Sequence, residues 1–530
     1  MLDPLPLTIP HVAKAAAERW GDAPALLENG ETWSFNQLWA ECQKAAAAFL
    51  WHGISNRDRI AIWAPNCRDW IVAAVGAMAA GATIVPLNTR LKGREAGDLL
   101  RRTRAKMLVT VEEFLGASYT ELLADEDLPD LENVLLIRGF AASRGSPFTS
   151  HEDAKTRMIA WHEFVAASGK TSQADVEASL ARLSPDDISD IMFTSGTTGT
   201  PKGVLTTHSR IIPQFGTWIE NTGLGEGERY LIVNPFFHSF GMKAGWVACL
   251  MAGAIMVPMP VFNVKAVIEA IERDRIAFLP GAPTIFQALL AEHEKQPFDT
   301  SSLRGGTTGA AVVPSILIER IRSELGMPDI ITAYGMTECT NITGCRRGDP
   351  AELIATTCGV AVPGNELCIV DEAGDPLPAG EPGEILVRGV GVMKGYLDDP
   401  AATAEAIDVD GWLHTGDVGV LDENGYLRIT DRKKDMYISG GFNVYPAEVE
   451  KLLSAHPAAA QVAVIGVPDD RMGETGKAFV ILRTGAITTP DDIIGWAREN
   501  MSNYKVPRAV EFVEALPLNA SGKVMKRDLR

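Results

Sequence analysis

The most informative segment of the chain is residues 194–203, Thr194-Ser195-Gly196-Thr197-Thr198-Gly199-Thr200-Pro201-Lys202-Gly203. They follow a short β-type run at residues 190–193. Glycines let backbone N–H groups turn toward an anion, hydroxyls donate to phosphate oxygens, and Lys202 supplies a positive charge. We therefore expect the loop to hold a polyphosphate. The loop does not have the Walker A spacing, Gly-x-x-x-x-Gly-Lys-Ser/Thr. The alternative is a plain surface turn, but a turn needs only one or two glycine or hydroxyl residues.

A second motif, Tyr334-Gly335-Met336-Thr337-Glu338, follows a predicted strand at residues 330–333. Ligands of an open parallel sheet bind beyond the carboxyl ends of its strands. An aromatic ring there can stack on a base, a hydroxyl can hold a phosphate, and a carboxylate can hold Mg²⁺ beside phosphates. The alternative is that Thr337 and Glu338 begin a helix and cap it.

Two further motifs lie nearer the C-terminus. Asp417 ends the run 412–417, and its carboxylate can accept hydrogen bonds from both hydroxyls of a ribose. The alternative for Asp417 is an exposed turn. Lys523 ends the run 517–523 near the C-terminus, and its ammonium could bring a positive charge to a site. The alternative for Lys523 is a solvated tail.

In order and spacing these motifs resemble those of the adenylate-forming enzymes, over about residues 10–530. That superfamily includes acyl-CoA synthetases, peptide-synthetase adenylation domains and luciferases. The resemblance implies that Tyr334 packs on adenine, Thr337 contacts the α-phosphate and Glu338 binds Mg²⁺. It implies the following further roles: Gly309, Ala310 and Ala311 line the adenine, Asp417 and Arg432 hold the ribose, Lys434 is the hinge, Lys523 is catalytic, and Ser439, Gly440 and Gly441 lead the pantetheine tunnel.

The resemblance also places an acyl pocket at the aromatic run 234–241, with Phe237 in its wall and His238 beside the reacting carboxylate. A packed core histidine is the alternative. Gly335 leaves space where a bulky residue would restrict the pocket to acetate-sized acids. The segment with Lys243 looks closest to ligases for cyclic propanoates from steroid-ring breakdown. We expect the Lys243 ammonium to meet a ketone of the acid; the alternative is a snorkelling lysine on a helix face.

The periodicity predicts an α/β fold with a doubly wound core. Residues 35–49 have helical spacing, and a strand, a helix and a strand follow at 59–63, 67–80 and 83–87, which is a βαβ unit. The pattern returns with strands at 230–233, 254–257, 276–279 and 330–334 and helices at 243–251, 264–273 and 313–325.

We expect two domains, since 530 residues exceed one core. Residues 1–433 form the large AMP-binding domain with its mixed sheets, including a β-rich subdomain at about 345–433. Residues 434–530 form a small, mobile α+β domain that carries Lys523. Its predicted elements are helices at 447–453 and 490–501 and strands at 461–465, 478–482 and 509–513.

Composition bounds the partners and the compartment. The net charge of −19 argues against nucleic acid. The seven cysteines show no metal-ligand spacing and indicate reduced thiols in a cytoplasmic protein. No signal peptide is expected, because residues 1–6 do not give a basic start followed by an apolar stretch. No transmembrane segment is expected, because the apolar stretches 71–86 and 246–260 are short and contain glycine. A homodimer is left open.

The sequence thus predicts a Mg²⁺-using, ATP-dependent carboxylic acid:CoA ligase that forms acyl-AMP and pyrophosphate, then acyl-CoA and AMP. The acid is expected to be medium-chain or cyclic, from lipid or steroid metabolism; a long-chain fatty acid is the alternative. An amino-acid adenylation domain would want an acidic residue at 238–246, and none is there. A luciferase-like oxygenase shares the motifs. A non-catalytic nucleotide-binding regulator should have lost Lys523 or Glu338.

Overall fold

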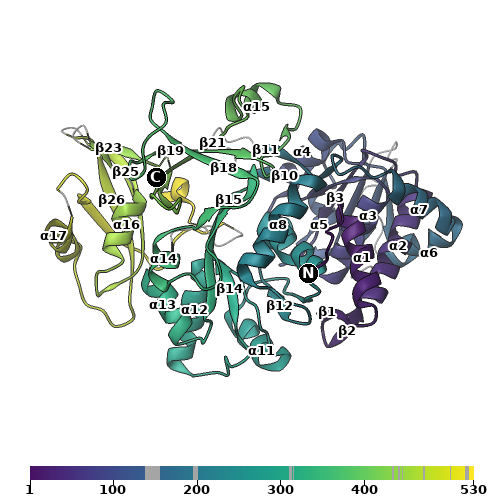
Figure 1. Ribbon diagram of the computed structural model, residues 1–530, viewed down its shortest axis with the longest axis horizontal. Helices are drawn as coiled ribbons and strands as arrows, with labels where there is room; N and C mark the ends of the chain where they lie inside the picture. The colour runs from purple at the N-terminus through teal and green to yellow at the C-terminus, as the bar shows by residue number, and fades with distance from the viewer. Residues whose placement is uncertain are drawn as a thin grey trace.

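The computed structural model describes residues 1–137, 156–194, 201–309, 313, 315–432, 435–439, 442–444, 446–469, 472–501, 503–519 and 524–529. Figure 1 shows the chain running from the first sheet with its helices (purple and blue, right), through a teal and green centre, to a C-terminal unit (yellow, left). The fold is the expected α/β architecture. Among the described residues, no helix combines the length and the apolar character needed to cross a membrane.

The first sheet carries the predicted βαβ unit. Strands β3 (Arg59–Trp63) and β4 (Thr83–Pro86) pair in parallel, and helix α3 (Arg68–Ala79) connects them. The sheet is parallel from β10 to β9 and turns antiparallel where β10 meets β11. Its order is β20 (Gly395–Tyr396), β11 (Lys202–Thr207), β10 (Ile188–Thr194), β4, β3, β5 (Met107–Thr110), β8 (Asn133–Leu136) and β9 (Arg157–Ala160).

Helices flank this sheet. Thr8 caps α1, and Ser34 caps α2 in a reciprocal capping box with Gln37. The predicted helical spacing at residues 35–49 is confirmed as α2. The helices of this part are α1 (Ile9–Trp20), α2 (Phe35–Trp51), α4 (Gly93–Thr103), α5 (Tyr119–Leu122), α6 (Trp161–Ala166), α7 (Gln173–Arg182) and α8 (His208–Thr222), and a small hairpin pairs β6 (Glu113–Phe114) with β7 (Ala117–Ser118).

A second layer consists of two four-stranded groups joined at Phe278. The predicted strand at residues 276–279 is wrong in extent, because only isolated parallel bridges form there, from Phe278 to Tyr230 and to Gly305. The first group is β12 (Arg229–Ile232), β13 (Ile255–Pro258), β1 (Pro24–Glu28) and β2 (Glu31–Ser34). The second is β14 (Gly305–Thr308), β15 (Asp329–Met336), β16 (Cys339–Gly344) and β17 (Val360–Ala361).

The connections of this layer are helical. The predicted helix at residues 243–251 begins as a π-helical turn, Met242–Val247, and continues as α10 (Ala248–Ala252). The others are the short α9 (Ser239–Gly241), α11 (Val264–Asp274), α12 (Pro283–Lys295), α13 (Ser315–Ser323) and α14 (Ala351–Thr356).

Two smaller sheets complete the chain. The first lies in the predicted β-rich region and is antiparallel, in the order β18 (Asn365–Val370), β19 (Gly383–Gly389), β21 (Leu413–Leu421) and β22 (Leu427–Arg432). Helix α15 (Pro400–Ala406) lies between β20 and β21. The last has the order β24 (Phe442–Val444), β23 (Tyr437–Ser439), β26 (Gly473–Leu482) and β25 (Ala459–Asp469), with β27 (Ala509–Phe512) parallel to β26 and with α16 (Pro446–Leu453) and α17 (Pro490–Asn500). The domain boundary near residue 433 stays a prediction.

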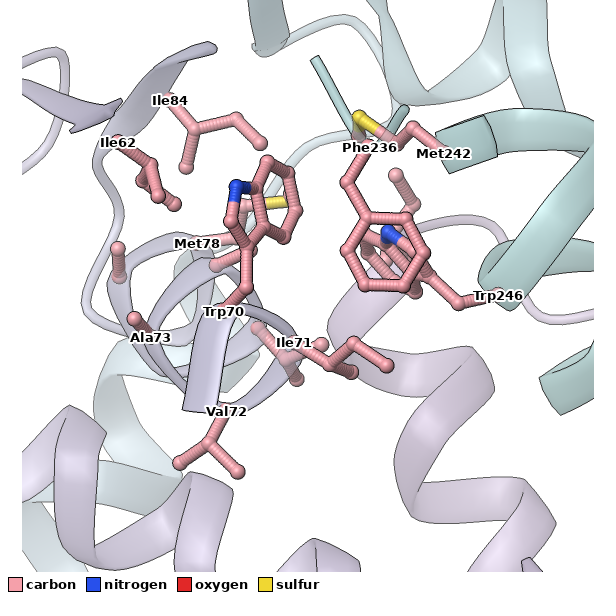
Figure 2. Packing of buried hydrophobic residues seen from close by; sticks show 14 of the residues in the cluster. Ile62, Trp70, Ile71, Val72, Ala73, Met78, Ile84, Phe236, Met242 and Trp246 are labelled. Carbon is pink, nitrogen blue, oxygen red and sulfur yellow. The ribbon is translucent and has the colours of Figure 1, made fainter. Parts of the chain in front are cut away.

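The largest buried cluster packs the helices around the first sheet, and one part of it joins α3 to the loop after β12. Figure 2 shows Trp70, from α3, with Ile62 and Ile84 on one side and Phe236 on the other. The Trp70 and Phe236 rings meet edge to face with centroids 5.4 Å apart, and both side chains are fully buried. Packing of this kind fixes the loop that leads to His238.

His208 anchors the N-terminal helix. It begins α8, is 2% exposed, and its Nδ1 accepts a hydrogen bond of 3.3 Å from the backbone N–H of Ile9. Burial lowers the pKa of the His208 imidazole from 6.5 to about 3, with a smaller contribution from His11. The imidazole is therefore neutral in the folded protein at neutral pH.

We predict a loss of stability on acidification through His208. Between pH 6.5 and pH 3 the unfolded chain binds a proton at this imidazole and the folded chain does not, so the free energy of unfolding falls as pH falls. The loss from pH 7 to pH 5 should be about 2 kcal/mol. Chemical unfolding of His208→Gln, which keeps an acceptor for Ile9, should show a pH dependence smaller by that amount. Equal pH dependence in the two proteins would contradict the prediction.

Candidate active site

The phosphate loop is held at both ends by one hairpin. Thr194, the last residue of β10, lies opposite Lys202, the first of β11, and the Thr194 hydroxyl reaches the Lys202 carbonyl at 3.5 Å. Cross-strand pairing therefore closes the base of the loop. Its central residues Ser195, Gly196, Thr197, Thr198 and Gly199 lie outside the described residues, so their predicted contacts stay predictions.

A second hairpin carries the motif 334–338. Tyr334, Gly335 and Met336 end β15, and Thr337 with Glu338 form the two-residue turn into β16. The helix-capping alternative is therefore wrong. Glu338 is 8% exposed, which is rare for a carboxylate unless a partner compensates its charge.

One short segment, Val392–Leu397, joins the two hairpins. Val392 bridges Cys339, and the Met393 N–H donates to the Glu338 carbonyl at 2.7 Å. Further along, Tyr396 pairs with Val204 of β11, and the Leu397 N–H donates to the Gly203 carbonyl at 2.7 Å. The turn with Glu338 is thus tied through backbone bonds to the strand with Lys202.

Tyr396 also joins the hairpins through its side chain. Its hydroxyl donates to Glu338 Oε1 at 2.9 Å, and the Lys202 Nζ lies 4.9 Å from its ring centroid. Burial and the Glu338 carboxylate raise the pKa of Tyr396, so the phenol stays protonated as a donor. Sequence reasoning missed this residue, because contacts between distant segments place it there: the Val392–Cys339 bridge brings its segment to Glu338, and the β11–β20 pairing brings it to Lys202.

Tyr334 and Asp417 form the next part of the site. The Tyr334 hydroxyl donates to Asp417 Oδ2 at 2.6 Å, and the two residues are 9% and 7% exposed. The exposed-turn alternative for Asp417 is therefore wrong. Asp417 lies opposite Arg432 in the β21–β22 pairing, so the two predicted ribose contacts occupy neighbouring strands.

Gly309, directly after β14, lies beside the strand that carries Tyr334. A Cβ there would come within 2.9 Å of the Ala333 carbonyl oxygen. Gly335 has a comparable constraint, because a Cβ would meet the Thr340 carbonyl at 2.3 Å across the hairpin. The hairpin thus gives Gly335 a structural reason besides pocket space. Ala310 and Ala311 lie outside the described residues.

The loop that carries His238 is held by the side chain of one residue, Asn66. The Asn66 side chain donates to the carbonyls of Ile232 (3.2 Å) and Asn234 (2.9 Å) and accepts from the Phe236 N–H (2.8 Å). Asn66 is 4% exposed, so these bonds are shielded from water. Phe237 and His238, further along, are only half-buried.

His238 caps the short helix α9, and its Nδ1 accepts from the Phe240 N–H at 3.2 Å. An accepting Nδ1 assigns the proton of the neutral ring to Nε2. The core-histidine alternative does not fit a half-buried ring. Ser239 then ties this helix to β10, since its hydroxyl lies 3.4 Å from Met192 Sδ.

Lys243 has a different partner from the one we expected. It is fully buried, its Nζ lies 3.0 Å from Asp190 Oδ1 of β10, and it donates to the Thr206 hydroxyl at 3.2 Å. The snorkelling alternative is wrong for a side chain that is 0% exposed. The partner that the structure shows is not a substrate ketone but the Asp190 carboxylate of β10, so a ketone contact of Lys243 stays a prediction that this ion pair does not support. Asp190 was missed because its partner lies 53 positions away in sequence.

The C-terminal site residues are described in part. Ser439 ends β23, is 3% exposed and pairs with Gly473. Near Lys523, a bridge joins Leu518 to Val524, and Lys526 binds Glu450 of α16 at 2.8 Å. The side chain of Arg432 is not described, and Lys434, Gly440, Gly441 and Lys523 lie outside the described residues.

The donors present suit a magnesium ion that is held chiefly by phosphate. Among the residues that the structure describes, no group of three or more His, Cys, Asp or Glu could enclose a metal. Mg²⁺ in nucleotide sites commonly takes one or two carboxylates, with phosphate oxygens and waters as its other ligands. Glu338, held near Lys202, fits that requirement.

Comparison with known proteins gives consistent matches along the chain. Residues 13–397 match the AMP-binding enzyme family, and residues 448–523 match the C-terminal domain of AMP-binding enzymes. The chain is 46% identical to the Rhodococcus jostii 3-[(3aS,4S,7aS)-7a-methyl-1,5-dioxo-octahydro-1H-inden-4-yl]propanoyl:CoA ligase, over 99% of this chain and 98% of that protein. It is 45% identical to the ligase of the same name from Mycobacterium tuberculosis, with the same coverage. The anthranilate CoA ligase AuaEII, solved with anthranoyl-AMP, superposes with a TM-score of 0.86 at 28% identity, over 99% of this chain and 97% of that one.

We predict that Lys243 acts on stability. Lys243→Met leaves the Asp190 carboxylate buried without its ammonium, which should lower the free energy of unfolding by roughly 3–5 kcal/mol. Adding Asp190→Asn removes the buried charge and should recover part of that loss. Chemical unfolding of the single and double variants measures both effects. A double variant no more stable than Lys243→Met would contradict the prediction.

Proposed function

The chain belongs to the AMP-binding enzymes and is an AMP-forming acyl-CoA ligase, and from this premise we propose that it activates a cyclic propanoic acid carrying ring ketones. The observation that carries the substrate proposal is the identity of 46% and 45%, along almost the whole chain, to two ligases named for one bicyclic dioxo acid. An unbranched medium-chain acid is the competing substrate.

The reaction has two transfers. In the first, a carboxylate oxygen attacks the α-phosphorus of ATP; the bond to the β-phosphate oxygen breaks, and pyrophosphate leaves. In the second, the CoA thiolate attacks the carbonyl carbon of the acyl-AMP anhydride, and AMP leaves. ATP is needed because a carboxylate is a poor electrophile, whereas its mixed anhydride is reactive.

We assign roles to the described residues on this basis. Lys202 and the loop behind Thr194 hold the β- and γ-phosphates. Tyr334 packs on adenine, while Asp417 accepts from the ribose hydroxyls together with Arg432. Thr337 contacts the α-phosphate. The buried Tyr334–Asp417 hydrogen bond supports this arrangement, because it joins the base and sugar contacts.

Mg²⁺ belongs to this proposal. When bound, it would neutralise phosphate charge as the pyrophosphate leaves. The burial of Glu338 and its hydrogen bond from Tyr396 support its choice as the carboxylate ligand. Lys523 would supply a second positive charge in the adenylation step. The hinge at Lys434 and the pantetheine contacts of Ser439, Gly440 and Gly441 belong to the second transfer.

The acyl pocket is assigned to the half-buried Phe237 and His238. Their loop rests on Asn66 and on the fully buried Trp70, so its shape should be fixed before the acid binds. A rigid aromatic wall suits a fused ring better than a mobile chain, which would have to lose more conformational freedom. A ring ketone would need a polar partner other than Lys243.

We also propose that the enzyme works in the cytoplasm. All seven cysteines lie in the described part of the chain and are reduced thiols, which suits a reducing compartment. A homodimer stays a prediction, and sedimentation of the purified enzyme would decide it.

The substrate proposal predicts a ranking of acids. With CoA and ATP present, kcat/KM should be highest for the dioxo-octahydro-indenyl propanoic acid and lower for octanoic acid. The value of kcat/KM should be lowest for an octahydro-indenyl propanoic acid without the ketones, because polar groups of the pocket would then lose their partners. Pyrophosphate release measured across this panel tests the ranking. A higher kcat/KM for octanoic acid would overturn the proposal of a cyclic substrate and would leave the acyl-CoA ligase activity unaffected.

Lys523 should separate the two transfers. Lys523→Ala should lower the rate of acyl-AMP formation by about 10²–10³, since it removes one charged group from the transition state. Conversion of supplied acyl-AMP to acyl-CoA should stay near the wild-type rate. Equal loss in both half-reactions would mean that Lys523 supports the structure and does not serve adenylation.

A further inference from the structure

Tyr396 is the one described side chain that contacts both the proposed metal ligand and the phosphate-loop lysine. Its hydroxyl donates to Glu338 Oε1 at 2.9 Å. Its ring lies under the Lys202 ammonium, with 4.9 Å from Nζ to the ring centroid. Neither contact follows from the motifs found in the sequence, none of which contains Tyr396.

The backbone around Tyr396 is fixed on both sides. The Tyr396 N–H donates to the Thr403 hydroxyl at 2.9 Å, and the next residue, Leu397, donates to Gly203 at 2.7 Å. Tyr396 also pairs with Val204, two residues after Lys202. The ring is therefore held at a fixed position relative to β11, and its hydroxyl can hold the Glu338 carboxylate in one orientation.

The two contacts reinforce each other electrostatically. A hydroxyl that donates to a carboxylate pushes electron density toward its ring, and a more negative ring face attracts an ammonium more strongly. Lys202, the Tyr396 ring and Glu338 thus form a chain that begins with a cation and ends with an anion. Such a chain keeps two opposite charges near one another without direct contact between them.

We propose that Tyr396 is a positioning residue for nucleotide binding: it orients the Glu338 carboxylate toward the metal and holds Lys202 at the base of the phosphate loop. The inference rests on the proposed function in one respect, the assignment of Glu338 to Mg²⁺. Hydrogen-bonded partners of a metal-binding carboxylate typically change metal affinity by about 10–100-fold when they are removed.

Two substitutions separate the two contacts. Tyr396→Phe removes the bond to Glu338 and keeps a ring beneath Lys202, whereas Tyr396→Leu removes both. Calorimetry of ATP binding with EDTA reports on Lys202, and a Mg²⁺ titration of the enzyme–ATP mixture reports on Glu338. No acid or CoA is added, so these readouts do not depend on turnover.

Tyr396→Phe should weaken Mg²⁺ binding about tenfold and leave metal-free ATP binding within about twofold. Tyr396→Leu should weaken metal-free ATP binding as well, by about fivefold, as expected for one cation–π contact. Tyr426→Phe is the matched control. Tyr426 lies in the turn between β21 and β22, and its hydroxyl also donates to a carboxylate, Asp349 Oδ1, at 3.5 Å. It should change neither binding constant.

Glu338→Gln, alone and combined with Tyr396→Phe, distinguishes the inference from the proposed function. If Tyr396 acts through Glu338, Glu338→Gln weakens Mg²⁺ binding at least as much, and adding Tyr396→Phe costs little more. An effect of Glu338→Gln with none of Tyr396→Phe would overturn the inference and keep the metal assignment. If Glu338→Gln does not change Mg²⁺ binding, the assignment of Glu338 to the metal is overturned. If Tyr396→Phe weakens Mg²⁺ binding while Glu338→Gln does not, or if the losses of the two variants add fully in the double variant, Tyr396 does not act through Glu338.

Discussion

The site depends on one backbone constraint, the double attachment of residues 392–397. This segment pairs with β16 at Cys339 and with β11 at Val204, so it carries hydrogen bonds to two hairpins that are remote in sequence. The hairpins belong to different sheets, and no other described strand joins β11 to the turn at Glu338. Without the segment, the phosphate loop and the candidate metal ligand would sit on separate layers. The segment 392–397, which includes the two-residue strand β20, therefore sets how the two hairpins lie relative to each other.

Much of this arrangement could be predicted from sequence, and the misses have a common cause. The βαβ unit at β3, α3 and β4 was predicted because its periods are local, and the motifs at Tyr334 and Asp417 were found because each is contiguous. Contacts between segments left no such signal. Tyr396 lies 58 positions from Glu338, and Asn66 lies 170 positions from Phe236, so neither partnership could be inferred from spacing. The strand expected at 276–279 formed only isolated bridges at Phe278. Its apolar residues predict burial, but they do not predict how many backbone pairs a neighbouring strand will make.

Lys243 illustrates the same limit for a single side chain. A lysine among aromatic and small residues can bind a ligand, reach water or pair with a buried acid, and the sequence alone does not separate these outcomes. The structure does, because Asp190 lies on β10 directly against the π-helical turn. The consequence reaches the acyl pocket, since the ion pair and the Ser239–Met192 contact fasten the His238 loop to the strand that leads into the phosphate loop. On the proposed roles, one rigid frame then presents both the acid and the phosphates.

The hydrogen bond from Tyr334 to Asp417 has a consequence for the evolution of this site. On the proposed roles, one phenol offers its face to the base and its hydroxyl to the carboxylate that binds the sugar. A substitution that tilts the ring to admit another base would also turn that carboxylate. Choice of base and choice of sugar should then be inherited together, and laboratory selection for a different nucleotide would have to replace both positions in one step.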